Sequence, residues 1–309
     1  MTITRLSASI CTYQSPPEEL LRLLNSLCAA AERLRERVYS EFRIDVSLID
    51  NAELPHLDIR ELGLDLSRLK AAGVSVTLRQ GWGNVGYGAA HNSVLSKLTS
   101  DYHLILNTDV ELAPDSLEYA VNYLSTAPDT VLVSPAATDF MGNKQHLCKA
   151  YPSLLQFWLR GYAPPFMRRQ FAKYMAAYER RDLDSMPSLP PLVKPRGQLT
   201  CTSSAPVETK ASEAQQAAPA VDVAIVSGCC MLCKTTALQK EGGFDPRFFL
   251  YFEDFDLSLR LGKHGSVVYL PTMRVRHGGG NAAKKGPEHR RYFIRSAVSF
   301  FNKHGWKLF

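Results

Sequence analysis

The first half of this 309-residue chain alternates β-rich runs with helical stretches. The run from Leu6 to Tyr13 predicts a buried strand, and the Ser-Pro-Pro-Glu-Glu sequence after it is typical of a helix start. Further strands are expected at 46–50, 74–79, 103–107 and 131–134, and helices at 88–98 and 115–124. This β-α-β-α-β order is the strongest constraint on the fold, because it predicts a mainly parallel sheet with helices on both faces.

Composition narrows the class of protein. The hydrophobic fraction of 45% excludes a wholly disordered or collagen-like chain. The net charge of +6 favours an anionic partner such as a nucleotide only slightly, and no concentrated basic stripe points to nucleic acid. No apolar run approaches the roughly 20 residues that span a bilayer, and the N-terminus does not resemble a signal peptide. We therefore expect a cytoplasmic protein whose seven cysteines are free thiols.

Residues 186–220 differ from the rest of the chain, because they hold six of the 18 prolines and no aromatic residue. Such a segment cannot bury enough apolar surface to offset its ordering entropy, which predicts a flexible insertion. An apolar strand is expected to resume over 221–234, and another over 266–270.

Polar side chains end three of the expected strands. In a parallel sheet, ligands bind outside the carboxyl ends of the strands, so these residues are candidates for a binding site. They are Thr12 and Tyr13, Asp50 and Asn51, and Asn107, Thr108 and Asp109.

Two of these features keep structural alternatives. The glycine-rich loop at 81–92 could hold an anion at a helix N-terminus, or it could be a tight turn with glycines at positive φ. Asp109 could bind a divalent cation together with a substrate diphosphate, or it could cap the helix expected near Pro114.

The sharpest feature is the run at 248–260, where aromatic residues lead directly into Glu253, Asp254 and Asp256. Clustered carboxylates beside apolar rings can raise one pKa toward the range of a general base, and the alternative is favourable interaction with a helix dipole. His277 ends a later expected strand and is followed by three glycines. In that position it could be a metal ligand, a proton carrier or a structural side chain.

Taken in order, these motifs resemble family 2 glycosyltransferases, particularly the rhamnosyltransferase-like branch. The resemblance covers about 6–145 and 221–305, and its most specific part is GGFDPRFFLYFEDFDLSLR followed by the strand-end histidine. It implies a GT-A fold, which is a Rossmann-like, mainly parallel α/β sheet flanked by helices. It also implies a nucleoside diphosphate sugar donor and an inverting transfer.

The resemblance also implies roles for particular residues. Asp254 matches the catalytic base, paired with Glu253 and supported by Asp256, while Asp109 matches the carboxylate that binds Mg²⁺ or Mn²⁺ and His277 completes the metal shell. The sequence Asn107-Thr108-Asp109 departs from the family's two aspartates, so we expect weak metal binding without the donor's diphosphate. Donor binding is expected at Thr12, Tyr13, Asp50, Asn51, Asn84, Gly86, Asn92 and Asn107.

The branch suggests L-rhamnose transfer from dTDP-L-rhamnose, or a UDP-type donor, to a hydroxyl of a glycan or lipid-linked saccharide in cell-surface polysaccharide synthesis. The alternative is a catalytically silent module that binds a nucleotide sugar or glycan. Residues 1–135 would form the nucleotide-sugar half and 221–309 the acceptor-binding and catalytic half. Between them, the helical segment 136–185 carries mixed aromatic and basic residues at 157–181, which could rest on the inner face of the cell membrane or pack on the sheet.

Overall fold

A computed structural model describes residues 5–37, 41–161, 163–186, 220–279 and 286–309. It shows an α/β fold in which one mixed sheet has the strand order β3-β2-β1-β4-β11-β6-β12-β5. β7 pairs with β6, and β9 pairs with β12. The strands are β1 (Arg5–Thr12), β2 (Arg43–Asp50), β3 (Val74–Arg79), β4 (Tyr102–Asn107), β5 (Val110–Leu112), β6 (Thr130–Thr138), β7 (Lys144–Gln145), β9 (Val221–Asp222), β11 (Cys230–Lys234) and β12 (Ser266–His277).

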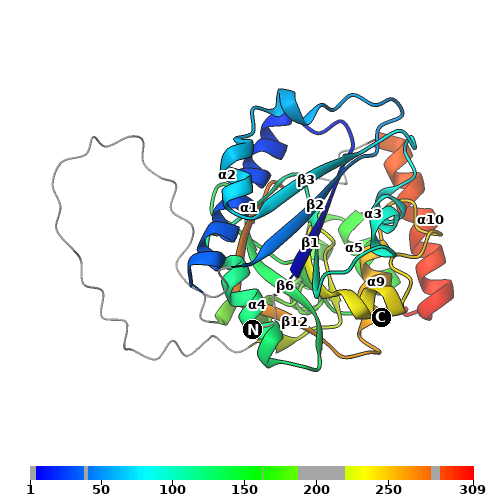
Figure 1. Ribbon diagram of the computed structural model, residues 1–309. Coiled ribbons are helices and arrows are strands. Elements are labelled where there is room, and N and C mark those ends of the chain that lie inside the picture. Colours follow the sequence, from blue (N-terminus) through cyan, green and yellow to red (C-terminus); the bar gives the residue numbers. More distant parts are fainter. Residues whose placement is uncertain (1–4, 38–40, 162, 187–219, 280–285) are drawn as a thin grey trace.

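Helices cover both faces of this sheet, as the alternating pattern predicts. Helices α1, α2 and α4 lie on one face, and α3, α5, α9 and α10 lie on the other (Figure 1). The helices are α1 (Pro17–Arg37), α2 (Leu66–Ala71), α3 (Tyr87–Leu95), α4 (Ser116–Thr126), α5 (Leu154–Gly161), α6 (Pro165–Gln170), α7 (Ala172–Tyr178), α8 (Thr235–Lys240), α9 (Glu253–Leu261) and α10 (Gly286–His304), with short 3₁₀ helices η1 (Ile59–Leu62) and η2 (Arg181–Ser185).

The first four strands of the alternating half pair in parallel, with β1 between β2 and β4. The register sets Thr12 beside Asp50 and Cys11 beside Asn107, so the polar strand ends lie level at one edge. The three strand ends that the sequence singled out as candidate binding positions therefore lie together. The sheet also contains a strand that the parallel pattern did not predict as such, because β11 runs antiparallel between β4 and β6.

The expected strand over 221–234 is wrong in its continuity. It is divided into β9, β10 (Ile225–Val226) and β11, and β10 leaves the main sheet to pair with β8 (Cys148–Lys149). The break between β10 and β11 is the turn Ser227–Gly228–Cys229, which we call the 227–229 turn. The pattern of apolar residues conceals this break, since Ile225 and Val226 of β10 and the first four residues of β11 are all apolar.

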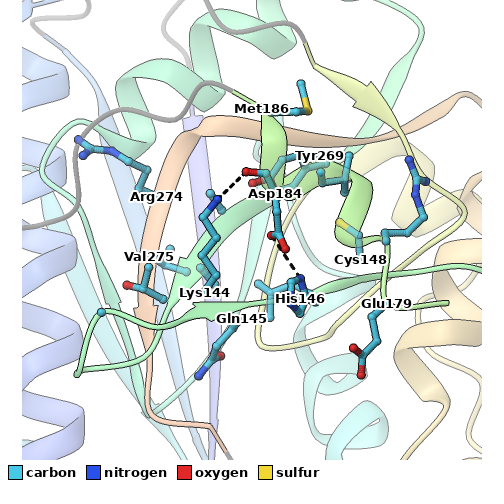
Figure 2. Close-up of a pocket in the computed structure, with 17 residues that line it drawn as sticks. Lys144, Gln145, His146, Cys148, Glu179, Asp184, Met186, Tyr269, Arg274 and Val275 are labelled. Carbon is cyan, nitrogen blue, oxygen red and sulfur yellow. Dashed lines mark hydrogen bonds and ion pairs between the residues drawn. The ribbon is translucent and has the colours of Figure 1, made fainter. Parts of the chain in front are cut away.

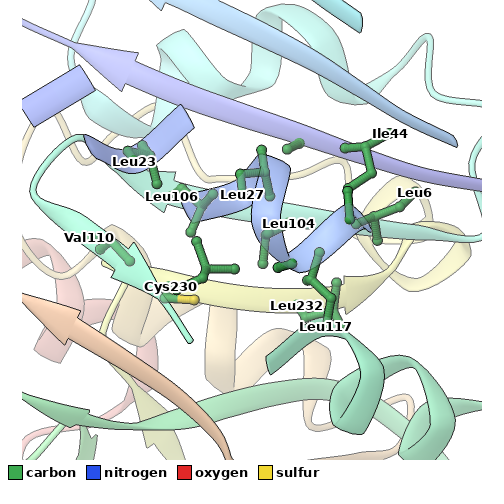
Figure 3. Close-up of a cluster of buried hydrophobic side chains, with 14 of the residues drawn as sticks. Leu6, Leu23, Leu27, Ile44, Leu104, Leu106, Val110, Leu117, Cys230 and Leu232 are labelled. Atoms are coloured by element: carbon green, nitrogen blue, oxygen red, sulfur yellow. The ribbon is translucent and has the colours of Figure 1, made fainter. Parts of the chain in front are cut away.

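The main core lies between α1, α4 and the sheet (Figure 3). Leu23 and Leu27 of α1 pack over Leu104 and Leu106 of β4, and all four side chains are fully buried. The three-to-four spacing of leucines in α1 is therefore the spacing of its buried face, and it fixes the position of β1 and β4 beneath it.

Three further sequence predictions can be compared with the described residues. Of the predicted insertion at 186–220, only Met186 and Ala220 are described, so that prediction lies almost wholly outside the described residues. The six cysteines within the described part of the chain are free thiols. None of the described helices is both long and apolar enough to cross a bilayer.

Candidate active site

The predicted donor residues interlock at the ends of β1 and β2. The Asn51 backbone N–H donates to the Thr12 carbonyl at 2.8 Å, and its side-chain amide donates to Asn84 Oδ1 at 3.1 Å. Thr12 Oγ1 is buried without a hydrogen-bond partner. Tyr13 lies exposed beside it, with 47% of its surface accessible. The structure therefore brings these four residues to one edge, and a ligand there would satisfy an orphaned hydroxyl.

Asp50 is buried, and its carboxylate is engaged by the chain itself. Its oxygens accept hydrogen bonds from the backbone N–H groups of Ala52 at 3.1 Å and His56 at 3.2 Å, and His56 Nδ1 lies 3.0 Å away. In this arrangement Asp50 shapes the loop after β2, so the predicted donor contact would have to coexist with these bonds.

The glycine-rich loop is a turn with positive φ angles and also the start of α3. Gly86 has φ +89°, and a Cβ atom there would lie 2.5 Å from the carbonyl oxygen of Phe249. The neighbouring Tyr87 N–H donates to that same oxygen at 3.0 Å. Only glycine fits this approach, which ties the loop to the segment before α9.

Asn92 has a different position from the other predicted donor residues. Its side chain donates to the carbonyl of Phe244 at 2.7 Å and accepts from the N–H of the same residue at 2.8 Å. Both polar groups of the amide are thus used to hold α3 against the segment after α8. The predicted nucleotide contact of Asn92 would require these bonds to open.

Asp109 and His277 come together, as predicted, although 168 positions separate them in the sequence. His277 Nε2 lies 3.4 Å from Asp109 Oδ1, and Gly278 N–H donates to the Asp109 carbonyl at 2.9 Å. The capping alternative for Asp109 is wrong, since β5 lies between it and α4, which follows Asp115.

Gln145 of β7 orients the imidazole of His277, and sequence reasoning missed it. Its Nε2 donates to the His277 carbonyl at 2.9 Å, so its Oε1, 2.7 Å from Nδ1, must accept the Nδ1 proton. Nε2 is then the unprotonated nitrogen and faces the Asp109 carboxylate. Burial lowers the pKa of His277, while the Asp109 charge opposes that shift. The neutral ring thus presents a lone pair toward the carboxylate.

This donor set fits a divalent cation. Two ligands in adjacent positions of an octahedral ion lie about 3 Å apart, since each metal–oxygen or metal–nitrogen distance is about 2.1 Å. The Asp109–His277 separation of 3.4 Å is close to that value. Across the described ranges, no three His, Cys, Asp or Glu side chains converge on one point. Diphosphate oxygens and water would therefore complete the shell.

Glu253 and Asp254 open α9 after two residues with strained backbone. Tyr251 and Phe252 have φ angles of +69° and +67°, a region that aromatic residues rarely occupy. Asp254 accepts hydrogen bonds from Gly228 N–H at 2.8 Å and Phe255 N–H at 2.9 Å. The turn before α9 thus directs this carboxylate onto the 227–229 turn.

The two carboxyl groups differ in their surroundings. Burial raises the pKa of Asp254, while its two backbone N–H partners oppose the rise. Burial, followed by the charge of Asp254, raises the pKa of Glu253 well above its usual range, and Glu253 Oε2 is buried without a partner. Asp254 is therefore the ionised member of the pair and Glu253 the protonated one.

Asp256 faces away from this pair and is a structural anchor. Its buried carboxylate accepts from Arg260 Nε at 2.7 Å and pairs with His304 at 2.7 Å and with Lys303. Burial acts to raise the pKa of Asp256, but the hydrogen bonds and charges of Lys303, Arg260 and His304 outweigh burial and lower the pKa. The predicted supporting role of Asp256 thus takes the form of holding α9 to α10.

The 227–229 turn connects the metal pair to Asp254. Tyr87 Oη donates to the Gly228 carbonyl at 2.8 Å, and Asn107 N–H donates to the Cys229 carbonyl at 2.9 Å. Burial raises the pKa of Cys229 to about 12, and the charges of Asp109 and Asp254 both add to the rise. The two carboxylates therefore lie near the same thiol.

Cys11 lies near two other carboxyl groups, Asp50 and Glu253. Burial raises its pKa to about 12, and the charges of Asp50 and Glu253 add to the rise. Sequence reasoning missed Tyr87 and Gly228 as members of the site. The signals for them were present, since Tyr87 follows the glycine-rich turn and Gly228 interrupts an apolar run.

A separate cavity of about 180 Å³ lies behind β7 and η2 (Figure 2). Lys144, His146, Asp184 and Tyr269 line it, and Lys144 Nζ donates to the Asp184 carbonyl at 2.7 Å. Gln145 also lines it and is its link to His277. No other residue of the candidate active site belongs to this cavity.

Residues 7–180 match the model of the family described as glycosyl transferase family 2. Over 291 residues the chain is 26% identical to the N-acetylglucosaminyl-diphospho-decaprenol L-rhamnosyltransferase of Mycobacterium tuberculosis, covering 89% of this chain and 76% of that protein.

Among solved structures, the chain resembles GalNAc-T7 with UDP, GalNAc and Mn²⁺ (TM-score 0.55, 14% identity), covering 96% of this chain and 49% of that one. It also resembles the mannosyltransferase PcManGT from Pyrobaculum calidifontis in complex with GDP-Man and Mn²⁺ (TM-score 0.52, 16% identity), covering 98% of this chain and 64% of that one. The chain thus spans half to two thirds of these two proteins, and both likenesses concern the fold. They confirm the predicted GT-A type α/β fold. Because the family model matches more than half of the sequence, from β1 through α7, the chain belongs to glycosyltransferase family 2.

Proposed function

We propose that this family 2 glycosyltransferase is an inverting, metal-dependent enzyme that moves L-rhamnose from dTDP-L-rhamnose to a hydroxyl of a lipid-linked saccharide. The sugar and acceptor class rest on the similarity to the mycobacterial L-rhamnosyltransferase. The observation that carries the catalytic proposal is that Asp254, bound to Gly228 N–H of the 227–229 turn, and Asp109, paired with His277, both lie close enough to Cys229 of that turn for their charges to act on its thiol.

The acceptor hydroxyl attacks the anomeric carbon opposite the leaving diphosphate, through a transition state with oxocarbenium character. Asp254 takes the hydroxyl proton as the new bond forms. The N–H groups of Gly228 and Phe255 hold its carboxylate in one orientation. Glu253, protonated beside it, adds no second negative charge to the site. A single displacement with one base inverts the configuration.

The diphosphate is the leaving group, and its negative charge grows as the bond to the sugar breaks. Asp109 Oδ1 and His277 Nε2 would hold a Mg²⁺ or Mn²⁺ ion that neutralises this charge. Gln145 keeps the lone pair of the imidazole turned toward Asp109. In this proposal the loop of Asn84 and Gly86 before α3 binds the nucleotide part of the donor.

The chain divides by role in this proposal. Residues 1–135 bind the nucleotide sugar, while 221–309 carry the base and the acceptor side. Residues 136–185 extend the acceptor side through α5, α6 and α7. Thr12, Asn51, Asn84 and Asn107 form the donor edge, where one hydroxyl still lacks a partner.

We further propose that α5, α6 and the C-terminal tail rest on an anionic membrane surface from its cytoplasmic side. One face of α5 packs through Phe157 against Phe252, just before α9, and Phe293 of α10, and not against the sheet. Its other face leaves Trp158 exposed, and Phe166 is exposed to 68%. The tail runs alongside, since Leu154 N–H donates to the Lys307 carbonyl at 2.9 Å. Sedimentation with anionic liposomes at low salt tests this contact, and no binding would contradict it.

The decisive experiment for the function is a donor screen with product detection. The protein is incubated with Mn²⁺, an N-acetylglucosaminyl diphospholipid and either dTDP-L-rhamnose, UDP-glucose or UDP-N-acetylglucosamine, and products are identified by mass spectrometry. We expect a product heavier by one deoxyhexose with dTDP-L-rhamnose only. Nucleotide binding without transfer to any acceptor would instead support a catalytically silent module.

A further inference from the structure

Two cationic side chains, Lys149 and Arg160, both contact Tyr178. Lys149 is on β8, whose partner strand β10 ends just before the 227–229 turn, and Lys149 is aligned with Ile225. Its neighbour Ala150 donates its N–H to the carbonyl of Tyr178, the last residue of α7, at 2.9 Å. Lys149, Tyr178 and Arg160 of α5 form what we call the Lys149 site.

Neither cation of this site is held in an ion pair among the described residues, although the charge of Glu179 acts on both. Lys149 Nζ lies over the Tyr178 ring, 5.7 Å from its centroid, and Arg160 interacts with the Tyr178 hydroxyl. Within the described part of the chain, no carboxylate lies within ion-pair distance of either one. The nearby Glu179 is bound by Arg181 at 2.7 Å.

The environment of Lys149 is that of a cation prepared for an anion. Burial lowers its pKa to about 8; Glu179 opposes this shift, and the charge of Arg160 adds to it. A half-buried ammonium group without an ion-pair partner is costly unless a ligand supplies a negative charge. Arg160 is exposed, so the site is open to solvent on that side.

The site lies near the base, because β10, the partner strand of β8, is bound through the Val226 N–H to Ser258 Oγ at 3.2 Å, and Ser258 Oγ donates to the Asp254 carbonyl at 2.7 Å. Burial raises the pKa of Tyr178 to about 12, Arg160 opposes the rise, and the charge of Asp254 adds to it. The donor's diphosphate belongs near Asp109 and His277. The residue of this segment that contacts His277 is Gln145 of β7, and Lys149 lies four residues further along the chain, on β8. An anion at Lys149 would therefore belong to the molecule whose hydroxyl Asp254 activates.

We propose that Lys149 and Arg160 bind the diphosphate of a saccharide diphospholipid acceptor, one sugar away from the hydroxyl that reacts. This inference rests on the proposed function. The Tyr178 side chain contacts both cations, Lys149 through its ring and Arg160 through its hydroxyl. A membrane phospholipid carries related phosphate chemistry, and the experiment below separates it from the acceptor.

The test compares two acceptors, farnesyl diphospho-N-acetylglucosamine and the uncharged octyl N-acetylglucosaminide. Replacing Lys149→Met or Arg160→Gln should raise KM for the diphosphate acceptor by about 10- to 100-fold, because each loses a charge-assisted hydrogen bond. The ratio of kcat/KM between the two acceptors should fall by the same factor. Lys149→Arg should restore most of this preference, and Lys240→Met, which removes an exposed lysine on α8, should leave the ratio unchanged.

Binding of farnesyl diphosphate alone, measured by calorimetry, gives a readout without turnover. The parent protein should bind it and Lys149→Met should bind it at least tenfold more weakly. Equal affinity of the two proteins, or an unchanged acceptor ratio, would overturn the inference. Loss of phosphatidylglycerol vesicle binding in Lys149→Met with an unchanged ratio would also overturn it and indicate a lipid headgroup. If the parent transfers sugar to neither acceptor, the proposed function fails, and farnesyl diphosphate binding still decides whether the anion site exists.

Discussion

Replacing Asp254 by asparagine removes the proton acceptor while keeping the shape of the side chain. General-base catalysis contributes about 10²- to 10⁴-fold, so we expect kcat/KM to fall by that factor. At 1.36 kcal/mol for each factor of ten, this corresponds to about 3–5 kcal/mol of transition-state stabilisation. Donor binding should change little, since the Asp254 carboxylate bonds to Gly228 and Phe255 and to none of the predicted donor residues.

The same substitution has a cost in stability that the hydrogen bonds define. Asp254 Oδ2 accepts from Gly228 N–H at 2.8 Å and Oδ1 accepts from Phe255 N–H at 2.9 Å. Asparagine has one acceptor oxygen, so one of these N–H groups would face an NH₂ group. Leaving a buried donor unsatisfied costs about 1–3 kcal/mol, so the free energy of unfolding should fall by that amount.

Glu253→Gln is the matched control. Glu253 is buried, and its raised pKa keeps it protonated at neutral pH, a state that glutamine resembles in shape and charge. We expect it to lose less than about tenfold in kcat/KM, a small loss beside that of a removed general base. The assay measures dTDP release with a rhamnose donor, with folding checked by thermal denaturation and donor binding by calorimetry.

Two results would refute this reasoning. One is a fully folded Asp254→Asn protein with turnover within tenfold of the parent. The other is a loss in Glu253→Gln as large as that in Asp254→Asn, which would transfer the base role to Glu253. The pH profile adds a third check. Burial raises the Asp254 pKa, and the base must be ionised, so kcat/KM should fall as the pH drops through that raised value.

Three other predictions concern the frame and the metal. Asp256→Asn should lower the free energy of unfolding by about 3–5 kcal/mol at pH 7, because a buried carboxylate bound by Arg260, Lys303 and His304 is lost. Since the folded-state pKa of Asp256 is lowered, its contribution is complete above about pH 4 and is lost as pH falls toward that lower value, which urea denaturation at several pH values would show. Gly86→Ala should cost about 1–3 kcal/mol of stability and weaken nucleotide binding, whereas Gly81→Ala, with nothing within 4 Å of its added Cβ, should affect binding less; equal dissociation constants would contradict the close approach to Phe249. Asp109→Ala should abolish the gain in dTDP affinity on adding Mn²⁺, and parent affinity that is the same with and without a chelator would remove the metal role.

Local patterns predicted the parallel half of the fold well. The leucine spacing of α1 and the apolar runs of β1, β2, β3 and β4 record which face each element buries, and burial depends mainly on the side chains of the element itself. The polar ends of these strands could be located for the same reason. The confirmed proximity of Asp109 and His277 came from the family resemblance, because the sequence pattern carries no distance between them.

Long-range contacts decided the rest. The antiparallel placement of β11 between β4 and β6 depends on competition among strands for partners, which no local pattern records. Gln145 orients His277 across 132 positions, and nothing in its short strand marks it as functional.

The sequence by itself determined which segments would become strands and helices, and that carboxyl groups would stand at their ends. Only the tertiary structure decided how adjacent acids would differ. Asp254 accepts hydrogen bonds from backbone N–H groups and stays charged, whereas Glu253 is buried without a partner and is neutral. Asp256 is bound by Arg260, Lys303 and His304 and holds α9 to α10. The reason is that the charge and role of a carboxyl group depend on the groups that folding brings around it.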